Sequence, residues 1–284
     1  MRIVVIGSTG QLGTDLVKTL VAAHEVVCLT HKEIEVSDYN SCLVLKEHKP
    51  DVVVNTAAFH KTDQCEDEPL KTFSVNSLGA RNVAQVTKEL GAIDVYISSD
   101  YVFDGTSKVP YTELDVPLPI NTYGISKLAA EFYTKLNPKH YILRIASVFG
   151  VAGASGKGGN FVETMITKAK KGEPISVVDD MYMSPTYTMD AASVLGGVLA
   201  SKLPFGVIHA TNSGYCSWYQ FAQTIFQLTG LTPDLKPTKT DPNYGKAKRP
   251  MFSALTSVKL PKYGLESRNW KEALRAYLTE KGHI

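Results

Sequence analysis

The chain has 284 residues, 44% of them hydrophobic and 20% charged, with a net charge of +2, so it can bury one large core or two smaller ones. Its basic residues are scattered, and no apolar stretch reaches membrane-spanning length or forms a signal-peptide core, which argues against nucleic acid and membrane as partners. The four cysteines include no Cys-x-x-Cys pair, so we expect free thiols and a cytoplasmic protein.

The N-terminal stretch combines a strand, a glycine turn and a helix. Residues 2–6 are mostly β-branched and predict a buried strand, and residues 12–23 have the apolar spacing of a helix. Between them lies the turn Gly7-Ser8-Thr9-Gly10-Gln11-Leu12-Gly13. This order leaves backbone amides at a helix N-terminus, where a dinucleotide pyrophosphate can bind. The alternative is that the glycines only make a tight turn.

The second predicted strand, residues 25–29, is followed by Thr30, His31 and Lys32 at the place where an adenosine ribose would lie. A carboxylate at position 30 would bind a free ribose 2′-hydroxyl and repel a 2′-phosphate, and none is present. The basic side chains of His31 and Lys32 favour the phosphate. We therefore predict that NADP is preferred to NAD; the alternative is that Lys32 is only a solvated loop residue.

Strands and helices continue to alternate along the first half of the chain. Asp38 is a predicted N-cap for a helix over residues 39–48, and Pro69 suits the first turn of a long helix that ends near Leu90. Further strands are predicted at residues 51–54, 94–98 and 141–145. The repeated strand and helix order predicts an α/β fold of the Rossmann type, a doubly wound parallel sheet with ligands at the carboxyl ends of its strands.

The stretch from Ile97 to Glu131 carries the predicted chemistry. Tyr123 and Lys127 are four residues apart at the head of a predicted helix, so both side chains lie on one face. We expect the ammonium to lower the phenol pKa from its ordinary value of about 10, and Ser99 to hold a substrate carbonyl while the phenol protonates it. Three Tyr and Lys pairs have this spacing, but only this one follows a serine at a strand end and a nucleotide-binding turn.

After residue 150 the regular alternation ends. We predict a NAD(P)-binding Rossmann domain at residues 1–150 and a smaller C-terminal substrate-binding lobe at 151–284, with a segment of about 184–202 that returns to the first domain. The Pro- and Lys-rich stretch 232–249 is expected to be an exposed loop. Helices are predicted at residues 161–171, 188–200, 217–228 and 271–281.

These motifs together resemble the dTDP-4-dehydrorhamnose reductase family within the extended short-chain dehydrogenase/reductases. The resemblance covers nearly the whole chain, and its most specific part is the block Ser99-Asp100-Tyr101-Val102-Phe103. It also rests on the glycine turn, Asn55 to Ala58, Tyr123 to Lys127, Gly159-Asn160-Phe161, Ser184-Pro185-Thr186 and Arg249-Pro250. It implies a reductase that uses NADPH or NADH on the 4-keto group of a nucleotide-linked 6-deoxysugar, with a homodimer as an assembly to consider.

The resemblance also implies roles for individual residues. Ser99 would polarise the ketone, Tyr123 would be the general acid, and Lys127 would hold the nicotinamide ribose while lowering the pKa of the tyrosine. The dinucleotide would contact Gly7, Thr9, Gly10, Gln11, Leu12, His31, Lys32, Glu35, Val36, Ala57, Ala58, Phe59, Tyr123 and Lys127. The substrate would contact Ser99, Asp100, Val148, Asn160 and Arg249, whose guanidinium suits a diphosphate, although a solvated loop arginine is an equal alternative.

Two departures from the family pattern leave alternatives open. Val148 stands where the family usually has a tryptophan against the sugar, and Glu35 stands where an aspartate is usual beside the adenine. No acidic cluster demands a metal. The rival functions are an epimerase or dehydratase that keeps its dinucleotide bound, and a regulatory subunit like the β subunit of methionine adenosyltransferase, which resembles the same family.

Overall fold

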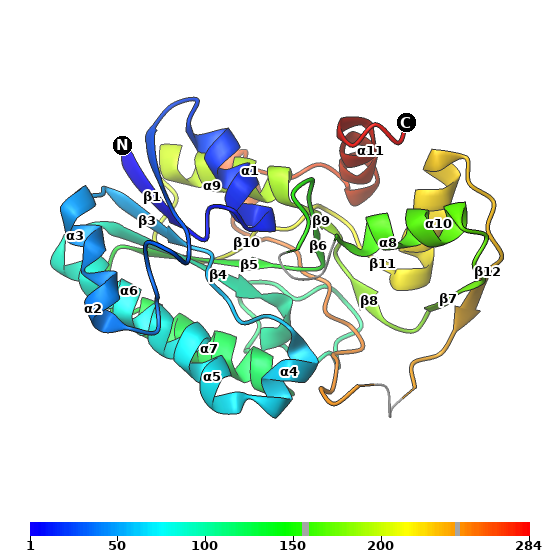
Figure 1. Ribbon diagram of the computed structural model, residues 1–284, viewed down its shortest axis with the longest axis horizontal. Helices are drawn as coiled ribbons and strands as arrows, with labels where there is room; N and C mark the ends of the chain where they lie inside the picture. The colour runs from blue at the N-terminus through cyan, green and yellow to red at the C-terminus, as the bar shows by residue number, and fades with distance from the viewer. Residues whose placement is uncertain (155–158, 242–244) are drawn as a thin grey trace.

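The structure is a computed structural model that describes residues 1–154, 159–241 and 245–284. Within these ranges a six-stranded sheet has the order β10-β5-β4-β3-β1-β2, and all its neighbouring strands pair in parallel (Figure 1). The predicted Rossmann-type parallel sheet is confirmed. The strands are β1 (Arg2–Ile6), β2 (Glu25–Leu29), β3 (Val52–Asn55), β4 (Ile93–Ser99), β5 (His140–Ile145) and β10 (Gly206–His209).

Helices cover both faces of this sheet because its strands are apolar on both sides. Along β1, Ile3 and Val5 pack with α1 (Gln11–Leu20) and α9 (Thr188–Ala200). The alternate residues Val4 and Ile6 pack on the opposite face with α6 (Gly79–Glu89). Helix α7 (Thr122–Thr134) lies beside α6 on that second face (Figure 1). Helix α9 and strand β10 come from the second half of the chain, but α9 packs on this sheet and β10 forms one of its edges.

Two predicted helices differ in detail from the structure. The helix expected over residues 39–48 is two short helices, α2 (Tyr39–Cys42) and α3 (Val44–His48), with the Asp38 carboxylate accepting from the amide of Asn40. The long helix expected from Pro69 to Leu90 has three parts: α5 (Pro69–Phe73), a π-helical turn η1 (Ser74–Leu78), and α6. The wider turn places Asn76 so that its amide bonds to both Phe59 N and Phe59 O, which fixes the loop after β3.

Most of the remaining elements form a second group, seen at the right of Figure 1. This group has its own core around Phe149, Tyr187, Phe221 and Tyr277. The stretch 232–249 was expected to be only a loop, but its residues 235–238 form β12, which pairs in parallel with β7; its residues 242–244 lie outside the described ranges. The other elements are α4 (Thr62–Asp67), η2 (Asp100–Val102), β6 (Val148–Phe149), α8 (Phe161–Lys170), β7 (Ile175–Val178), β8 (Tyr182–Met183), β9 (Thr186–Tyr187), β11 (Cys216–Ser217), α10 (Trp218–Thr229), β12 (Leu235–Thr238), η3 (Leu260–Tyr263) and α11 (Trp270–Glu280). No helix in the described ranges is long and apolar enough to span a bilayer.

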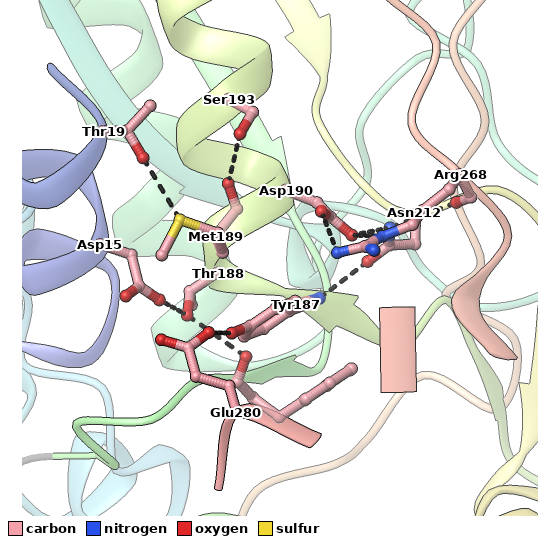
Figure 2. Close-up of polar contacts among 11 residues, drawn as sticks. Asp15, Thr19, Tyr187, Thr188, Met189, Asp190, Ser193, Asn212, Arg268 and Glu280 are labelled. Atoms are coloured by element: carbon pink, nitrogen blue, oxygen red, sulfur yellow. Dashed lines mark hydrogen bonds and ion pairs between the residues drawn. The ribbon is translucent and has the colours of Figure 1, made fainter. Parts of the chain in front are cut away.

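Polar contacts hold the two groups together where α1, α9 and the C-terminal helix α11 meet (Figure 2). The buried Asp15 carboxylate on α1 accepts a hydrogen bond from the Thr188 hydroxyl at the start of α9. Glu280 on α11 accepts a hydrogen bond from the Tyr187 hydroxyl. Glu280 also pairs with Lys18 on α1, with Nζ 2.6 Å from Oε1. These contacts tie the helix that follows the glycine turn to the second group of elements.

A buried ion pair fixes α7 against the sheet. The Arg144 guanidinium on β5 makes two hydrogen bonds to the Glu131 carboxylate on α7, of 2.8 and 2.7 Å, and both side chains are almost fully buried. Ser98 Oγ on β4 donates to the same carboxylate at 2.6 Å. In the strand register Arg144 lies between Ser98 and His209, so the pair spans three neighbouring strands. Removal of one partner from such a pair strongly destabilises the folded protein, because the other charge is then buried without a partner.

We expect Arg144→Met to lower the free energy of unfolding by about 3 to 5 kcal/mol, because the Glu131 carboxylate would lose its charged partner. The double variant Glu131→Met with Arg144→Met should recover most of that loss, since no buried charge remains. Denaturant unfolding monitored by circular dichroism measures both. A single variant within about 1 kcal/mol of the wild type would contradict the importance of the pair.

Candidate active site

A cavity of about 1430 Å³ lies at the carboxyl ends of β1, β3 and β4, between the Rossmann sheet and the second group of elements. Its wall includes the glycine turn, the loop after β3, the end of β4 and the start of α7. Every site residue predicted above except Lys32 lines this cavity. Residues that are up to about 240 positions apart in the sequence, Thr9 and Arg249 among them, therefore face one space.

The glycine turn is built for close approach of a ligand to the backbone. Gly7 has φ of +77°, and a side chain at Gly13 would bring its Cβ within 2.1 Å of Gly7 O, so neither position tolerates a larger residue without a shift. Helix α1 begins after Gly10 with no side-chain cap, which leaves the amides of its first turn to a ligand. These residues fit a pyrophosphate, which such amides and the helix dipole attract.

Two loops form the next part of the wall. The loop after β3 contributes Ala57, Ala58 and Phe59, small or flat side chains beside the sheet edge. The loop after β2 contributes Glu35 and Val36, and the Glu35 carboxylate accepts from the amide and hydroxyl of Ser37. His31 Nε2 lies 3.3 Å from Glu35 Oε2. The predicted dinucleotide contacts therefore form one continuous surface from the glycine turn to His31.

Lys32 is the one predicted site residue that the structure does not bring to the cavity. The Glu33 carboxylate accepts from the amide and hydroxyl of Thr30, and the amide of Lys32 donates to Thr30 Oγ1. This tight turn leaves Lys32 exposed and outside the wall. Of the two basic residues predicted to favour the phosphate, only His31 lies in the wall, so the geometry does not place Lys32 beside a ribose phosphate.

Ser99 and Asp100 are both buried at the end of β4. Ser99 Oγ donates to Asp100 Oδ1 at 2.9 Å and accepts from the amide of Tyr101 at 3.2 Å. Burial raises the pKa of the Asp100 carboxyl to about 6, and hydroxyls of Ser253 and Ser99 act in the opposite direction. The site therefore contains a second group that can hold a proton near neutral pH, in direct contact with the predicted ketone-binding hydroxyl.

Helix α7 presents Tyr123 and Lys127 to the cavity from its first turns. Its N-cap is Asn121, whose side-chain oxygen accepts from the amide of Gly124 at 2.7 Å. Gly124 touches the chain after β4 so closely that a Cβ there would lie 2.1 Å from Tyr101 O. This contact sets Tyr123 next to the end of β4, which carries Ser99.

The pKa values in the site differ from the expectation. Burial raises the pKa of Tyr123 above its ordinary value, with hydrogen bonding from Ser99 acting against the rise, instead of Lys127 lowering it. Burial also lowers the pKa of Lys127 to about 7, although Glu131 acts in the opposite direction. Lys127 Nζ donates to Ile97 O at 2.5 Å and lies 4.3 Å from the centre of the Tyr96 ring. Tyr123 is thus a protonated phenol throughout the neutral range.

The other residues predicted for the substrate side also line the cavity. Val148 lines it from β6, and Asn160 is the N-cap of α8, with its amide nitrogen donating to Gly150 O and the Tyr277 hydroxyl. Asn160 thus has a clear structural role. The Arg249 guanidinium pairs with Asp63 on α4, with Nη2 2.9 Å from Oδ2, and this pair sets it in the cavity wall.

Several wall residues escaped the sequence analysis. Phe161 and Trp218, with ring centroids 4.7 Å apart, give the cavity an aromatic wall although Val148 replaces the usual tryptophan. The only feature of the sequence that could have indicated Trp218 as a wall residue is its place directly after the N-cap Ser217, which puts a large ring at the start of a helix. This indication is weak. The pair of Glu131 and Arg144 was also missed, although Glu131 follows Lys127 by one helical turn.

Comparisons with known proteins agree with this geometry. The family model described as the RmlD substrate binding domain matches residues 1–282. The chain is 39% identical over 283 residues to the spore coat polysaccharide biosynthesis protein SpsK of Bacillus subtilis (strain 168), covering 99% of this chain and 98% of that protein. A crystal structure of a dTDP-4-dehydrorhamnose reductase from Clostridium acetobutylicum ATCC 824 has a TM-score of 0.93 at 37% identity, covering 99% and 100% of the two chains. A dTDP-4-dehydrorhamnose reductase from Bacillus anthracis str. Ames in complex with NADP has a TM-score of 0.92 at 35% identity, covering 98% and 99%.

The low pKa of Lys127 predicts an unusual pH dependence of stability. The unfolded chain keeps the lysine proton to about pH 10.5, whereas the folded protein loses it at about pH 7, so the stability from this group rises with pH between the two values. We expect Lys127→Met to make the ligand-free protein more stable than the wild type at about pH 6, on the order of a few kcal/mol, with a smaller gain at about pH 9.

Unfolding curves of both proteins across this pH range measure the difference. Lys135→Met, which replaces an exposed lysine at the end of the same helix, is the matched control and should show no such pH-dependent gain. A stability difference between Lys127→Met and the wild type that stays constant with pH would contradict the buried ammonium.

Proposed function

The chain belongs to the RmlD substrate binding domain family, and from this premise we propose that it is an NADPH-dependent reductase of the 4-keto group of a nucleotide-linked 6-deoxysugar. The names of two solved relatives, both dTDP-4-dehydrorhamnose reductases and one in complex with NADP, support the proposal. The observation that carries it is the single cavity shared by the glycine turn and by Ser99, Tyr123 and Lys127.

We propose the following roles for Tyr123, Ser99 and Lys127 in the reaction. When bound, the reduced nicotinamide supplies the hydride. The Tyr123 phenol, which burial keeps protonated, donates its proton to the oxygen of the carbonyl that becomes an alkoxide. Ser99 donates a hydrogen bond to the same oxygen, which stabilises the negative charge that develops there. Lys127 would bind the nicotinamide ribose.

The two ends of the cavity suit the two parts of the proposed reaction. The elements of residues 1–150, together with α9 and β10, would bind the dinucleotide, and the remaining elements of residues 151–284 would bind the sugar nucleotide. Arg249 at the far end would bind the diphosphate of the substrate, held in place by Asp63. The aromatic pair of Phe161 and Trp218 would supply the flat apolar surface that sugar rings and bases pack on.

We also propose that the protein is a cytoplasmic homodimer. All four cysteines are free thiols, and three of them are buried, which suits a reducing compartment. Ile125 and Phe132 on α7 and Leu136 just after it are exposed and do not line the cavity, an apolar set that suits contact with a second copy. Light scattering on the purified protein tests the assembly.

If Tyr123 is the proton donor, Tyr123→Phe should lower kcat by about 10² to 10⁴-fold while the affinity for NADPH stays near that of the wild type. The assay is NADPH oxidation with dTDP-4-keto-6-deoxymannose or dTDP-4-keto-6-deoxyglucose as substrate. Tyr133→Phe makes the same chemical change on the same helix, away from the cavity, and should leave the rate unchanged.

The same assay separates the rival functions. Turnover of Tyr123→Phe close to the wild-type rate would remove the phenol from the mechanism. An epimerase or dehydratase would convert the sugar without net oxidation of NADPH, and a regulatory subunit would show no turnover of either substrate. Either result with the wild-type protein would end the reductase proposal.

The choice of cofactor gives a second test. His31 lies in the wall and Lys32 does not, so we expect His31→Ala to raise KM for NADPH more than KM for NADH, and more than Lys32→Ala does. Steady-state kinetics with both cofactors at about pH 6.5 provide the measurement. Equal effects of His31→Ala on the two cofactors would show that this side chain does not contact the 2′-phosphate.

A further inference from the structure

Ser147 has a backbone conformation that a serine rarely adopts. Its φ of +42° lies in the left-handed region, where Lys49 is the one other non-glycine residue of the described ranges. Lys49 is the C-cap of α3, and helix ends are the usual place for this conformation. Ser147 instead lies between β5 and β6 in the wall of the cavity. Residues strained in this way gather at functional sites, where the surrounding structure holds them.

The contacts on either side of Ser147 show what holds it. Its carbonyl accepts a hydrogen bond from the amide of Thr186 on β9 at 3.3 Å, and β6 pairs in parallel with β9. The carbonyl of the next residue, Val148, accepts from Gln11 Nε2 on α1 at 3.2 Å. The strained backbone is therefore fixed from one side by the second group of elements and from the other by the helix that follows the glycine turn.

The hydroxyl of Ser147 is available to a ligand. It makes no hydrogen bond to any of the described residues, and the side chain is only half-buried in the cavity wall. A hydroxyl can donate one hydrogen bond and accept two, so it binds either a donor or an acceptor. The backbone strain at Ser147 is thus not explained by a contact of its own side chain within the protein.

The position of Ser147 in the sheet indicates what it would contact. Ile145, two residues earlier on the chain, is the register partner of Ser99, and neighbouring strands lie about 4.8 Å apart. Gln11 connects the peptide after Ser147 to the glycine turn. Ser147 therefore lies between the turn proposed to bind the pyrophosphate and the hydroxyl proposed to bind the ketone. A dinucleotide that spans these two points has its nicotinamide ring beside Ser147.

We propose that the Ser147 hydroxyl binds the carboxamide of the nicotinamide ring, an inference that rests on the reductase function proposed above. A carboxamide offers both N–H donors and a carbonyl acceptor, and a hydroxyl can bind either. The carboxamide is the one polar substituent of the ring, so holding it fixes the rotation of the ring. This contact thereby sets which face of the nicotinamide is turned toward the ketone held by Ser99 and Tyr123.

Equilibrium binding tests this contact without turnover. Isothermal titration calorimetry compares NADPH with 2′-phospho-ADP-ribose, which is the same cofactor without its nicotinamide. Ser147→Ala should weaken the binding of NADPH by about three- to tenfold, the effect of one lost hydrogen bond, and leave the affinity for 2′-phospho-ADP-ribose unchanged. The matched control is Ser193→Ala, an exposed serine of α9 outside the cavity wall, which should change neither affinity.

Two results would overturn the contact. Equal weakening of both ligands by Ser147→Ala would show that the residue only shapes the wall. An unchanged NADPH affinity with a raised KM for the keto sugar would show that the hydroxyl binds the sugar instead. A wild-type protein that binds NADPH but oxidises it with neither keto sugar would overturn the reductase proposal, whereas the binding comparison would still test the carboxamide contact.

Ser147→Gly separates the hydroxyl from the backbone strain. Glycine adopts a positive φ without strain, whereas alanine keeps the Cβ that causes it. Both variants should lose the same share of NADPH affinity, while the Tm of Ser147→Gly should be higher than that of Ser147→Ala. A Tm of Ser147→Gly below that of Ser147→Ala would contradict the idea that a strained serine is kept here for its hydroxyl. Circular dichroism confirms that both variants are folded.

Discussion

The close contact between Gly124 and the chain after β4 is the constraint on which the site depends. Only a residue without a side chain allows the first turn of α7 to meet the Tyr101 carbonyl, and this contact brings Tyr123 beside Ser99. The buried pair of Glu131 and Arg144 holds the same helix two turns further on. The helix is thus fixed at both ends, which is how a rigid scaffold keeps reacting groups in position before a ligand arrives.

The same burial that fixes these groups sets their proton affinities. Lys127 loses much of its affinity for a proton because its ammonium is removed from water, while Tyr123 and Asp100 hold their protons more strongly. A phenol with a raised pKa is a poor source of phenolate but a suitable donor to an alkoxide, which is a strong base. In a reductase the proton donor must be loaded when the hydride arrives. The ligand-free site favours that protonated state.

The sequence predicted the parts of the site that depend on local spacing. The glycine turn, the strand that ends at Ser99 and the helix that carries Tyr123 and Lys127 each follow from short-range patterns. It could not predict the pKa values, because desolvation depends on the packing of β4, α7 and the second group of elements together. The sequence also could not show that Lys32 lies outside the cavity wall. The position of Lys32 is set by a turn in which the Glu33 carboxylate accepts hydrogen bonds from Thr30. Trp218 and Phe161 were missed for the same reason: only the fold brings α8 and α10 to the cavity.

The substitution of Val148 for the usual tryptophan need not remove the aromatic surface of the substrate side. Val148 lies on β6 next to the glycine turn, where Gln11 Nε2 donates to its carbonyl. The aromatic rings of Phe161 and Trp218 come instead from α8 and α10, which belong to the second group of elements. Neither ring comes from the elements that carry Ser99 and Tyr123. The aromatic surface and the pair of Ser99 and Tyr123 therefore come from separate parts of the fold.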